Sequence, residues 1–352
     1  MKFRSMLALA GVMALAACGG EAGQQQGQSE RAAGSGGEVN LYTARHYDSD
    51  LALYDRFTRE TGLRINRIEG NADQLIARMR SEGSRSPADL FITADAGALW
   101  RAQQAGLFQP VQSQVLSGQV PENLRQPGGN WFGFTRRARV VAFNPERVRP
   151  DEVDSYEKLA SPSLRNRLCV RSSDNIYNLS LVGALIEAWG EAKAEQWARG
   201  IVANMARPPE GGDRDQIRAI GAGICDVAIT NSYYFIRMAS GDEARDREIA
   251  GRLRLGFPSL DGRGSHVNIS GGGVAANAPN RDNAVRFLEF LASADAQQHF
   301  ARHNNEFPAS PGVAAPPPVD AYASFQAHPM PVATFAAHQP RAQAIMSRAG
   351  WR

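Results

Sequence analysis

Short apolar runs alternate with longer amphipathic segments along the chain, and these two periodicities predict strands and helices respectively. In the first third of the chain, strand-like runs occupy residues 39–44, 63–70 and 88–95, and helix-like segments occupy residues 50–62, 72–83 and 96–106. Gly62 and Gly83 stand where two of these helices should end. A strand–helix–strand–helix–strand order predicts a parallel sheet covered by helices.

Two later apolar runs, residues 138–144 and 265–277, look able to cross from one lobe to another. A second unit of strand-like and helix-like segments lies between them, and an amphipathic helix pair follows at residues 280–302. The pattern predicts an α/β fold of two lobes, with the two crossing strands as hinge and a ligand cleft near the carboxyl ends of strands. The predicted N-lobe spans residues 39–135 and 268–310, and the C-lobe spans residues 136–267 and 311–352.

The start of the chain is predicted to stand outside this fold. A positively charged start precedes an apolar stretch that ends in "LAAC" at Cys18, which is the pattern of a secretory signal with a cysteine after the cleavage site. It resembles a bacterial lipoprotein signal, so residues 1–18 are predicted to be a signal peptide with Cys18 as lipid anchor. Plain secretion is the alternative. Residues 19–38, rich in Gly, Gln and Ser, read as a flexible linker. We therefore expect a periplasmic protein tethered to a membrane.

The bulk composition is that of an ordinary soluble protein. Of the 352 residues, 43% are hydrophobic and 21% are charged, and the net charge of +3 comes without any basic run. Nothing here indicates binding to nucleic acid. Cys169 and Cys225 each open a strand-like run, and outside the cytoplasm such a pair predicts a disulfide if the two strands are neighbours. Two free buried thiols are the alternative.

Tyrosines follow the predicted strands of both lobes. Tyr47 lies in "RHYD", Tyr177 in "NIYN", and Tyr233 and Tyr234 are adjacent in "NSYYFIRM". Phenolate oxygen is a hard anionic donor that suits Fe(III), and a trivalent cation can displace the phenolic proton. The adjacent tyrosines can both reach one metal only if a turn or helix begins there, because strand neighbours point to opposite faces. A Tyr-Tyr pair alone is more typical of aromatic packing.

Four segments together resemble the periplasmic ferric-ion-binding proteins of ABC importers: "VNLYTARHYD", "ADLFITADAG", "RLCVRSSDNIYN" and "CDVAITNSYYFIR". The resemblance covers nearly all of the chain from Val39 and is closest to the branch that binds iron mainly through tyrosines. It implies the type II periplasmic-binding-protein fold and Fe(III) as the cargo. The ligands that it implies are Tyr47, Tyr177, Tyr233 and Tyr234. His46 matches a histidine that some members use, and in this branch we expect it beside the metal.

The charge of such a centre predicts nearby cations. Fe(III) with four phenolates carries a formal charge of minus one, and burying a net charge is costly unless it is paired. Arg137 and Arg237 resemble positions beside the ligands in the family, Arg45 is a further candidate cation, and Asn231 is a candidate hydrogen-bond donor. Other family members use fewer tyrosines with a carbonate or phosphate, so a synergistic anion such as carbonate stays open here.

The resemblance implies a monomeric receptor that captures ferric iron or a ferric chelate and delivers the metal to an inner-membrane ABC permease and its ATPase. The alternative is a solute-binding protein for a small anion or phosphorylated solute, held by Arg45, Arg137 and Arg237. The chain has no Gly-x-Ser-x-Gly elbow and no two-cysteine zinc pattern, so we do not expect an enzyme.

Overall fold

The computed structural model describes residues 37–352. The predicted signal peptide with Cys18, and the linker up to residue 36, lie outside the described residues. The first strand begins at Glu38, which the sequence pattern placed at the end of the linker. Within residues 37–352, no helix combines the length and the apolar character needed to cross a membrane.

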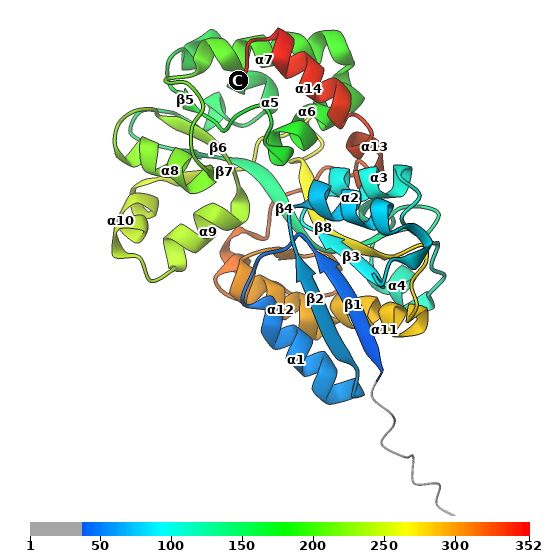
Figure 1. The fold of residues 1–352 in the computed structure, drawn as a ribbon. Coiled ribbons are helices and arrows are strands. Elements are labelled where there is room, and N and C mark those ends of the chain that lie inside the picture. Colours follow the sequence, from blue (N-terminus) through cyan, green and yellow to red (C-terminus); the bar gives the residue numbers. More distant parts are fainter. Residues whose placement is uncertain (1–36) are drawn as a thin grey trace, which may run out of the picture. The chain divides into compact units, whose positions relative to one another are not determined.

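A mixed sheet of nine strands runs through the molecule (Figure 1). Its strands are β1 (Glu38–Thr43), β2 (Arg64–Glu69), β3 (Leu90–Thr93), β4 (Phe132–Phe143), β5 (Leu168–Cys169), β6 (Val227–Asn231), β7 (Arg254–Gly256), β8 (Val267–Val274) and β9 (Phe307–Pro308). The order is β2-β1-β3-β8-β4-β6-β5, and β7 and β9 also pair with β4. β1 pairs in parallel with β2 and with β3, which confirms the predicted parallel start.

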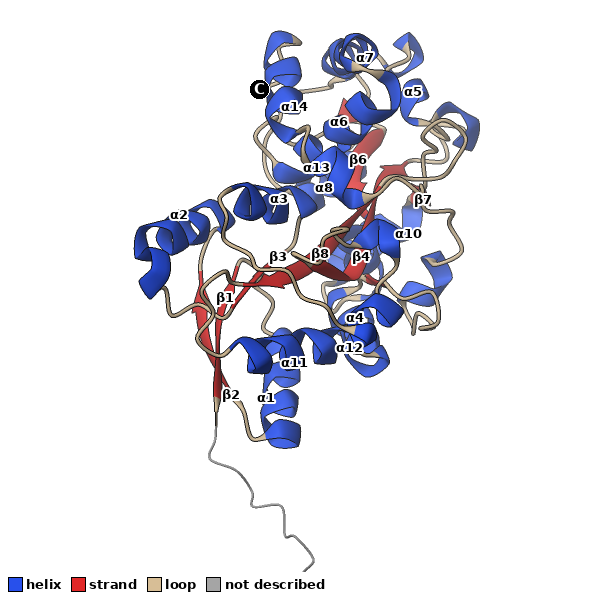
Figure 2. Cartoon of the chain, turned by 90° about the vertical axis from the view of Figure 1, so that its right-hand side faces the viewer, coloured by secondary structure: helices blue, strands red, loops and turns tan. Residues whose placement is uncertain are grey.

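Helices cover both faces of this sheet. They are α1 (Asp50–Thr61), α2 (Ala72–Glu82), α3 (Ala96–Gln104), α4 (Gln114–Gln119), α5 (Tyr156–Leu159), α6 (Ile176–Trp189), α7 (Glu191–Asn204), α8 (Asp213–Gly221), α9 (Ser232–Ser240), α10 (Ala244–Arg252), α11 (Arg281–Ala292), α12 (Ala294–Asn304), α13 (Val332–Ala336) and α14 (Gln339–Arg348). Figure 2 shows α2 and α3 on one side of β1 and β3, with α1 and α11 on the other. The helix α1 buries Leu53, Tyr54 and Phe57, and it is capped by Gly62, whose φ of 73° is left-handed.

The strands β4 and β8 are the two that the sequence predicted to cross. Residues 132–138 of β4 pair with β8, whereas residues 139–143 pair with β6, so this one strand joins the two halves of the sheet. Three glycines, Gly271 to Gly273, let β8 pack closely between its neighbours. A Cβ built on Gly273 would lie 2.2 Å from the Asn130 carbonyl oxygen. The exact lobe boundaries stay a prediction.

Two further contacts tie the second half together. A disulfide joins Cys169, at the end of β5, to Cys225, two residues before β6, and these strands are parallel neighbours. The C-terminal helices α13 and α14 both pack on α6, and α13 also packs on α3. The C-terminal segment therefore contacts elements from both halves of the sheet.

Candidate functional site

The four candidate tyrosines lie in segments that follow strands. Tyr47 follows β1, Tyr177 is the second residue of α6, and Tyr233 and Tyr234 lie in the first turn of α9. The strand β6 ends at Asn231 and α9 begins at Ser232, so the adjacent tyrosines are in a helix. The condition set by the sequence, that a turn or helix begins here, is therefore met, and the two side chains need not point to opposite faces of a strand.

The tyrosines from the second half of the sheet contact one another. The Tyr233 hydroxyl donates to the Tyr177 hydroxyl at 3.2 Å. The rings of Tyr233 and Tyr234 lie 4.2 Å apart between centroids, so the adjacent pair stacks at an angle rather than diverging. Tyr233 is 1% exposed, whereas Tyr47, Tyr177 and Tyr234 keep part of their surface open to solvent.

The phenols also interact through charge. Burial raises the pKa of Tyr47, Tyr177 and Tyr233, and for Tyr177 and Tyr233 the other tyrosines raise the pKa further. Tyr47 comes from the other half of the sheet and also raises the pKa of both, and the Arg237 guanidinium of α9 lies 5.7 Å from the centre of the Tyr47 ring. Raised pKa values mean that these phenols hold their protons near neutral pH until a cation displaces them.

Two of the three candidate arginines are buried in ion pairs. Arg45 Nε lies 2.8 Å from an Asp50 oxygen, and Arg45 Nη1 lies 3.0 Å from Glu306. Arg137 pairs with the same Glu306 and donates to the Ala94 carbonyl at 2.7 Å. The Arg45 guanidinium stands 4.7 Å from the centre of the Tyr47 ring, which places a cation against this tyrosine. Both arginines therefore lie beside the tyrosines with their positive charges already paired with carboxylates.

Glu306 is the central residue that the sequence did not reveal. It is 0% exposed and follows the end of α12, in a stretch that reads only as a helix end. Burial raises its pKa, but Arg45 and Arg137 outweigh burial and lower the pKa to about 2. The glutamate is therefore ionised. No local sequence pattern around Glu306 predicts that it pairs with these two arginines.

Arg139 forms a second buried ion pair beneath Tyr177. Its Nη1 lies 2.8 Å from Asp213 and 3.2 Å from the Asn231 side-chain oxygen, and its guanidinium is 5.8 Å from the Tyr177 ring centre. Arg137 and Arg139 are two residues apart on β4 and so share a face, a signal that the sequence did contain. The Asn231 side chain contacts Arg139 rather than a tyrosine hydroxyl, and its role near the metal stays a prediction.

The two remaining candidates lie at the edge of the cluster. Arg237 is one turn beyond Tyr233 on α9, with its guanidinium 5.7 Å from the centre of the Tyr47 ring. His46 is turned toward solvent, with 56% of its side chain exposed, and its Nδ1 lies 3.9 Å from Glu69. The part of His46 in metal binding, and its expected place beside the metal, stay predictions.

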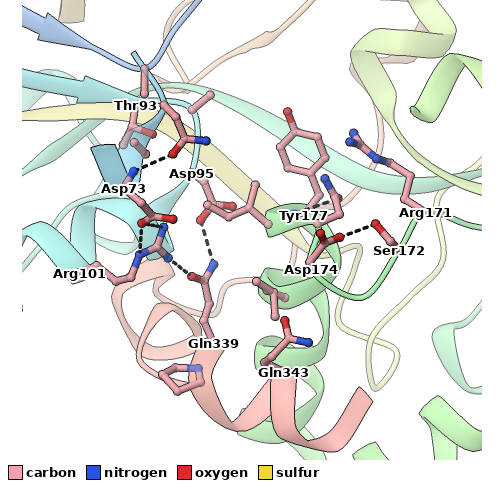
Figure 3. Close-up of a pocket in the computed structure, with 18 of the residues that line it drawn as sticks. Asp73, Thr93, Asp95, Arg101, Arg171, Ser172, Asp174, Tyr177, Gln339 and Gln343 are labelled. Atoms are coloured by element: carbon pink, nitrogen blue, oxygen red, sulfur yellow. Dashed lines mark hydrogen bonds and ion pairs between the residues drawn. The ribbon is translucent and has the colours of Figure 1, made fainter. Parts of the chain in front are cut away.

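A cleft of about 710 Å³ opens beside Tyr177. Figure 3 shows Tyr177 and Arg171 on one side of it and Asp73, Asp95 and Arg101 on the other. Across residues 37–352, no group of three or more histidine, cysteine, aspartate or glutamate side chains could hold a metal ion. The candidate donor set is the tyrosine cluster described above.

The chain is similar to known bacterial proteins. Residues 85–328 match the family model described as bacterial extracellular solute-binding protein. Iron uptake protein A2 of Synechocystis is 48% identical over 324 residues, which cover 92% of this chain and 92% of the relative. The major ferric iron-binding protein of Neisseria meningitidis is 27% identical over 321 residues, which cover 90% of this chain and 93% of the relative.

Solved structures agree with these sequence relatives. A protein from Trichodesmium (IdiA, FutA), in complex with iron and citrate ligands, matches with a TM-score of 0.86 at 48% identity, covering 90% of this chain and 100% of that one. A ferric binding protein from Campylobacter jejuni matches with a TM-score of 0.84 at 35% identity, covering 89% and 100%. These matches confirm the predicted two-lobed type II periplasmic-binding-protein fold.

Proposed function

Because this chain belongs to the family of bacterial extracellular solute-binding proteins, we propose that it is an extracytoplasmic receptor for ferric iron. The relatives named above are iron uptake and ferric iron-binding proteins. The observation that carries the proposal is the gathering of four phenols from three separate segments, with the hydroxyls of Tyr233 and Tyr177 only 3.2 Å apart. Such a donor set suits a hard trivalent cation.

The proposed ligands are Tyr47, Tyr177, Tyr233 and Tyr234. Fe(III) would displace their protons, because a trivalent cation stabilises phenolate far more than phenol. Tyr47 comes from the half of the sheet that holds β1, and the other three come from the half that holds β6. Iron would therefore bridge the two predicted lobes and favour the closed form by its greater affinity for that form.

The charges around the cluster support a ferric tetraphenolate. Arg45, Arg137 and Arg237 supply three positive charges, and the buried carboxylates of Asp50 and Glu306 offset two of them. Among these five groups one positive charge remains, opposite in sign to the formal minus one of Fe(III) with four phenolates. The cleft beside Tyr177 leaves room for a carboxylate chelator or carbonate to share the metal.

The alternative solute, a small anion or phosphorylated compound held by arginines, has less support. Arg45 and Arg137 are already paired with carboxylates, so an anion would have to compete with Asp50 and Glu306 for them. The named relatives are binding and uptake proteins, and we propose binding rather than turnover for this chain.

The proposed delivery partner is an inner-membrane ABC permease with its ATPase. Family membership supports a solute-binding role in such import, and a monomer is the form that we propose. The receptor would act in the periplasm, tethered to a membrane through acylated Cys18, a residue outside the described part of the chain.

The test is a titration of apo-protein with ferric citrate. Phenolate-to-iron charge transfer should give a visible colour that saturates at one iron per chain, and Tyr233→Phe or Tyr234→Phe should weaken and shift it. Tyr42→Phe is the matched control, because the Tyr42 hydroxyl donates to Glu82 at 2.8 Å and lies outside the cluster. If the wild-type protein stays colourless and binds no iron, the proposal is wrong. Phosphate-type solutes that bind without iron, in calorimetry, would favour the alternative.

A further inference from the structure

Asp95 is a buried carboxylate that none of the proposed iron chemistry uses. It precedes α3, is 2% exposed, and accepts four hydrogen bonds from neutral groups. The donors to Oδ1 are the Gly97 backbone N–H at 2.7 Å and Gln339 Nε2 at 3.0 Å. The donors to Oδ2 are Ser180 Oγ at 2.8 Å and Asn268 Nδ2 at 2.7 Å. No cation is among these four donors, although the charges of Arg101 and Arg137 also lower the pKa of Asp95.

These donors come from both halves of the sheet. Gly97 and Asn268 belong to α3 and β8, on the side of β1 and β3, whereas Ser180 and Gln339 belong to α6 and α14. Gln339 also donates to Ser180 Oγ at 2.9 Å and accepts from Arg101 Nη1 at 2.6 Å. Figure 3 shows Gln339 lying between Arg101 and Asp95 at the wall of the cleft.

The link to the tyrosines runs along α6. Ser180 is three residues after Tyr177 on this helix, and residues three apart lie on one face of a helix. Through Ser180, the Asp95 carboxylate therefore contacts α6 one turn beyond Tyr177, on the face of the helix that carries the Tyr177 phenol. Separating α6 and α14 together from α3 would remove two of the four donors of a buried charge, which is costly unless water replaces them.

We propose that Asp95 is a positioning residue for iron binding: through Ser180 and Gln339 it fixes the first turn of α6, and with it Tyr177, against the end of β3. This inference rests on the proposed ferric-iron function for its effect on affinity. Burial raises the pKa of Asp95, and the hydrogen bonds from Ser180 and Gly97 oppose that rise, as expected for a carboxylate that depends on these donors.

Ser180→Ala is the sharpest variant, because it removes the bond to α6 and leaves the carboxylate with three donors. Residues that orient metal ligands typically affect metal affinity by about tenfold to a hundredfold, so a loss of at least about tenfold is expected. The iron charge-transfer band should also shift as Tyr177 moves. Ser86→Ala is the matched control: Ser86 Oγ donates to a Glu82 oxygen at 2.7 Å, within one half of the sheet.

A second variant, Gly97→Ala, keeps every charge. A Cβ at Gly97 would lie 2.0 Å from the Gln339 side-chain amide, so the methyl group should displace that flexible side chain from Asp95. Alanine suits a helix better than glycine, which favours folding of this variant. It should reproduce the loss of affinity and the spectral shift.

Hydrogen exchange of apo-protein gives a readout that does not need iron. Ser180→Ala should speed exchange in the first turn of α6, whereas Ser86→Ala should not. Wild-type affinity, an unshifted band and unchanged exchange in Ser180→Ala overturn the inference. If the wild-type protein binds no iron, the iron function fails, and the exchange experiment alone still decides whether Asp95 anchors α6.

Discussion

Glu306 offers the most direct test of how charge is arranged around the tyrosines. Its carboxylate is 0% exposed, accepts from Ser270 Oγ at 3.1 Å, and pairs with Arg45 and Arg137. Glu306→Gln keeps the shape of the side chain and removes its charge. Arg45 would still have Asp50 at 2.8 Å, whereas Arg137 would lose its carboxylate partner.

The expected cost follows from that asymmetry. Removing one partner of a buried ion pair typically costs about 3–5 kcal/mol, because the other charge is left buried and uncompensated. Glutamine can still accept a hydrogen bond, and the Ala94 carbonyl still accepts from Arg137 at 2.7 Å. We therefore expect Glu306→Gln to lower the free energy of unfolding by about 3 kcal/mol, the lower end of that range.

The assay is denaturant unfolding of apo-protein at neutral pH. Glu248→Gln is the control, because Glu248 pairs with Arg252 on the surface, where both side chains are more than half exposed. Surface pairs contribute about 0–1 kcal/mol, so this control should unfold almost as the wild type does. Iron should stabilise Glu306→Gln more than wild type, since a negatively charged ferric centre would replace the lost charge beside Arg137. A Glu306→Gln protein as stable as the control would refute the reasoning.

Three further outcomes are expected. Because burial raises the pKa of Tyr233 and its partners, iron binding must release protons, and competition against a chelator should show affinity falling from about pH 8 to pH 6; constant affinity contradicts this. Burial lowers the pKa of His266 to about 3, so folded protein keeps it neutral while unfolded chains bind a proton below about pH 6.5. The free energy of unfolding should fall by about 1.4 kcal/mol per pH unit below that point, and this slope should be absent in His266→Phe. Equal slopes for the wild type and His266→Phe would contradict this prediction. Replacing Cys169 and Cys225 by alanine opens a loop with a sequence separation of 56 and should cost about 4 kcal/mol in denaturant unfolding; unchanged stability rules that out.

Local patterns were enough to predict much of the fold. The first three strands pair in parallel as expected, and the amphipathic segments became α1, α2 and α3 within a few residues of the predicted bounds. The helix α6 begins at Ile176, where the Asn175 side chain caps it by accepting from the Tyr177 N–H at 3.2 Å. That cap places Tyr177 in the first turn of a helix instead of in a loop.

The sequence by itself determined which residue types stand at the strand ends, because strand and helix periods and the tyrosines are local features of the chain. It could not show how the charges pair. Glu306 meets Arg45 across 261 positions, and Asp95 meets Gln339 across 244. Such pairs form only when distant segments pack together and exclude water, so no local period announces them. Only the tertiary structure showed that the arginines beside the tyrosines are paired with carboxylates. Only the tertiary structure showed that the buried Asp95 links α6 to the opposite half of the sheet.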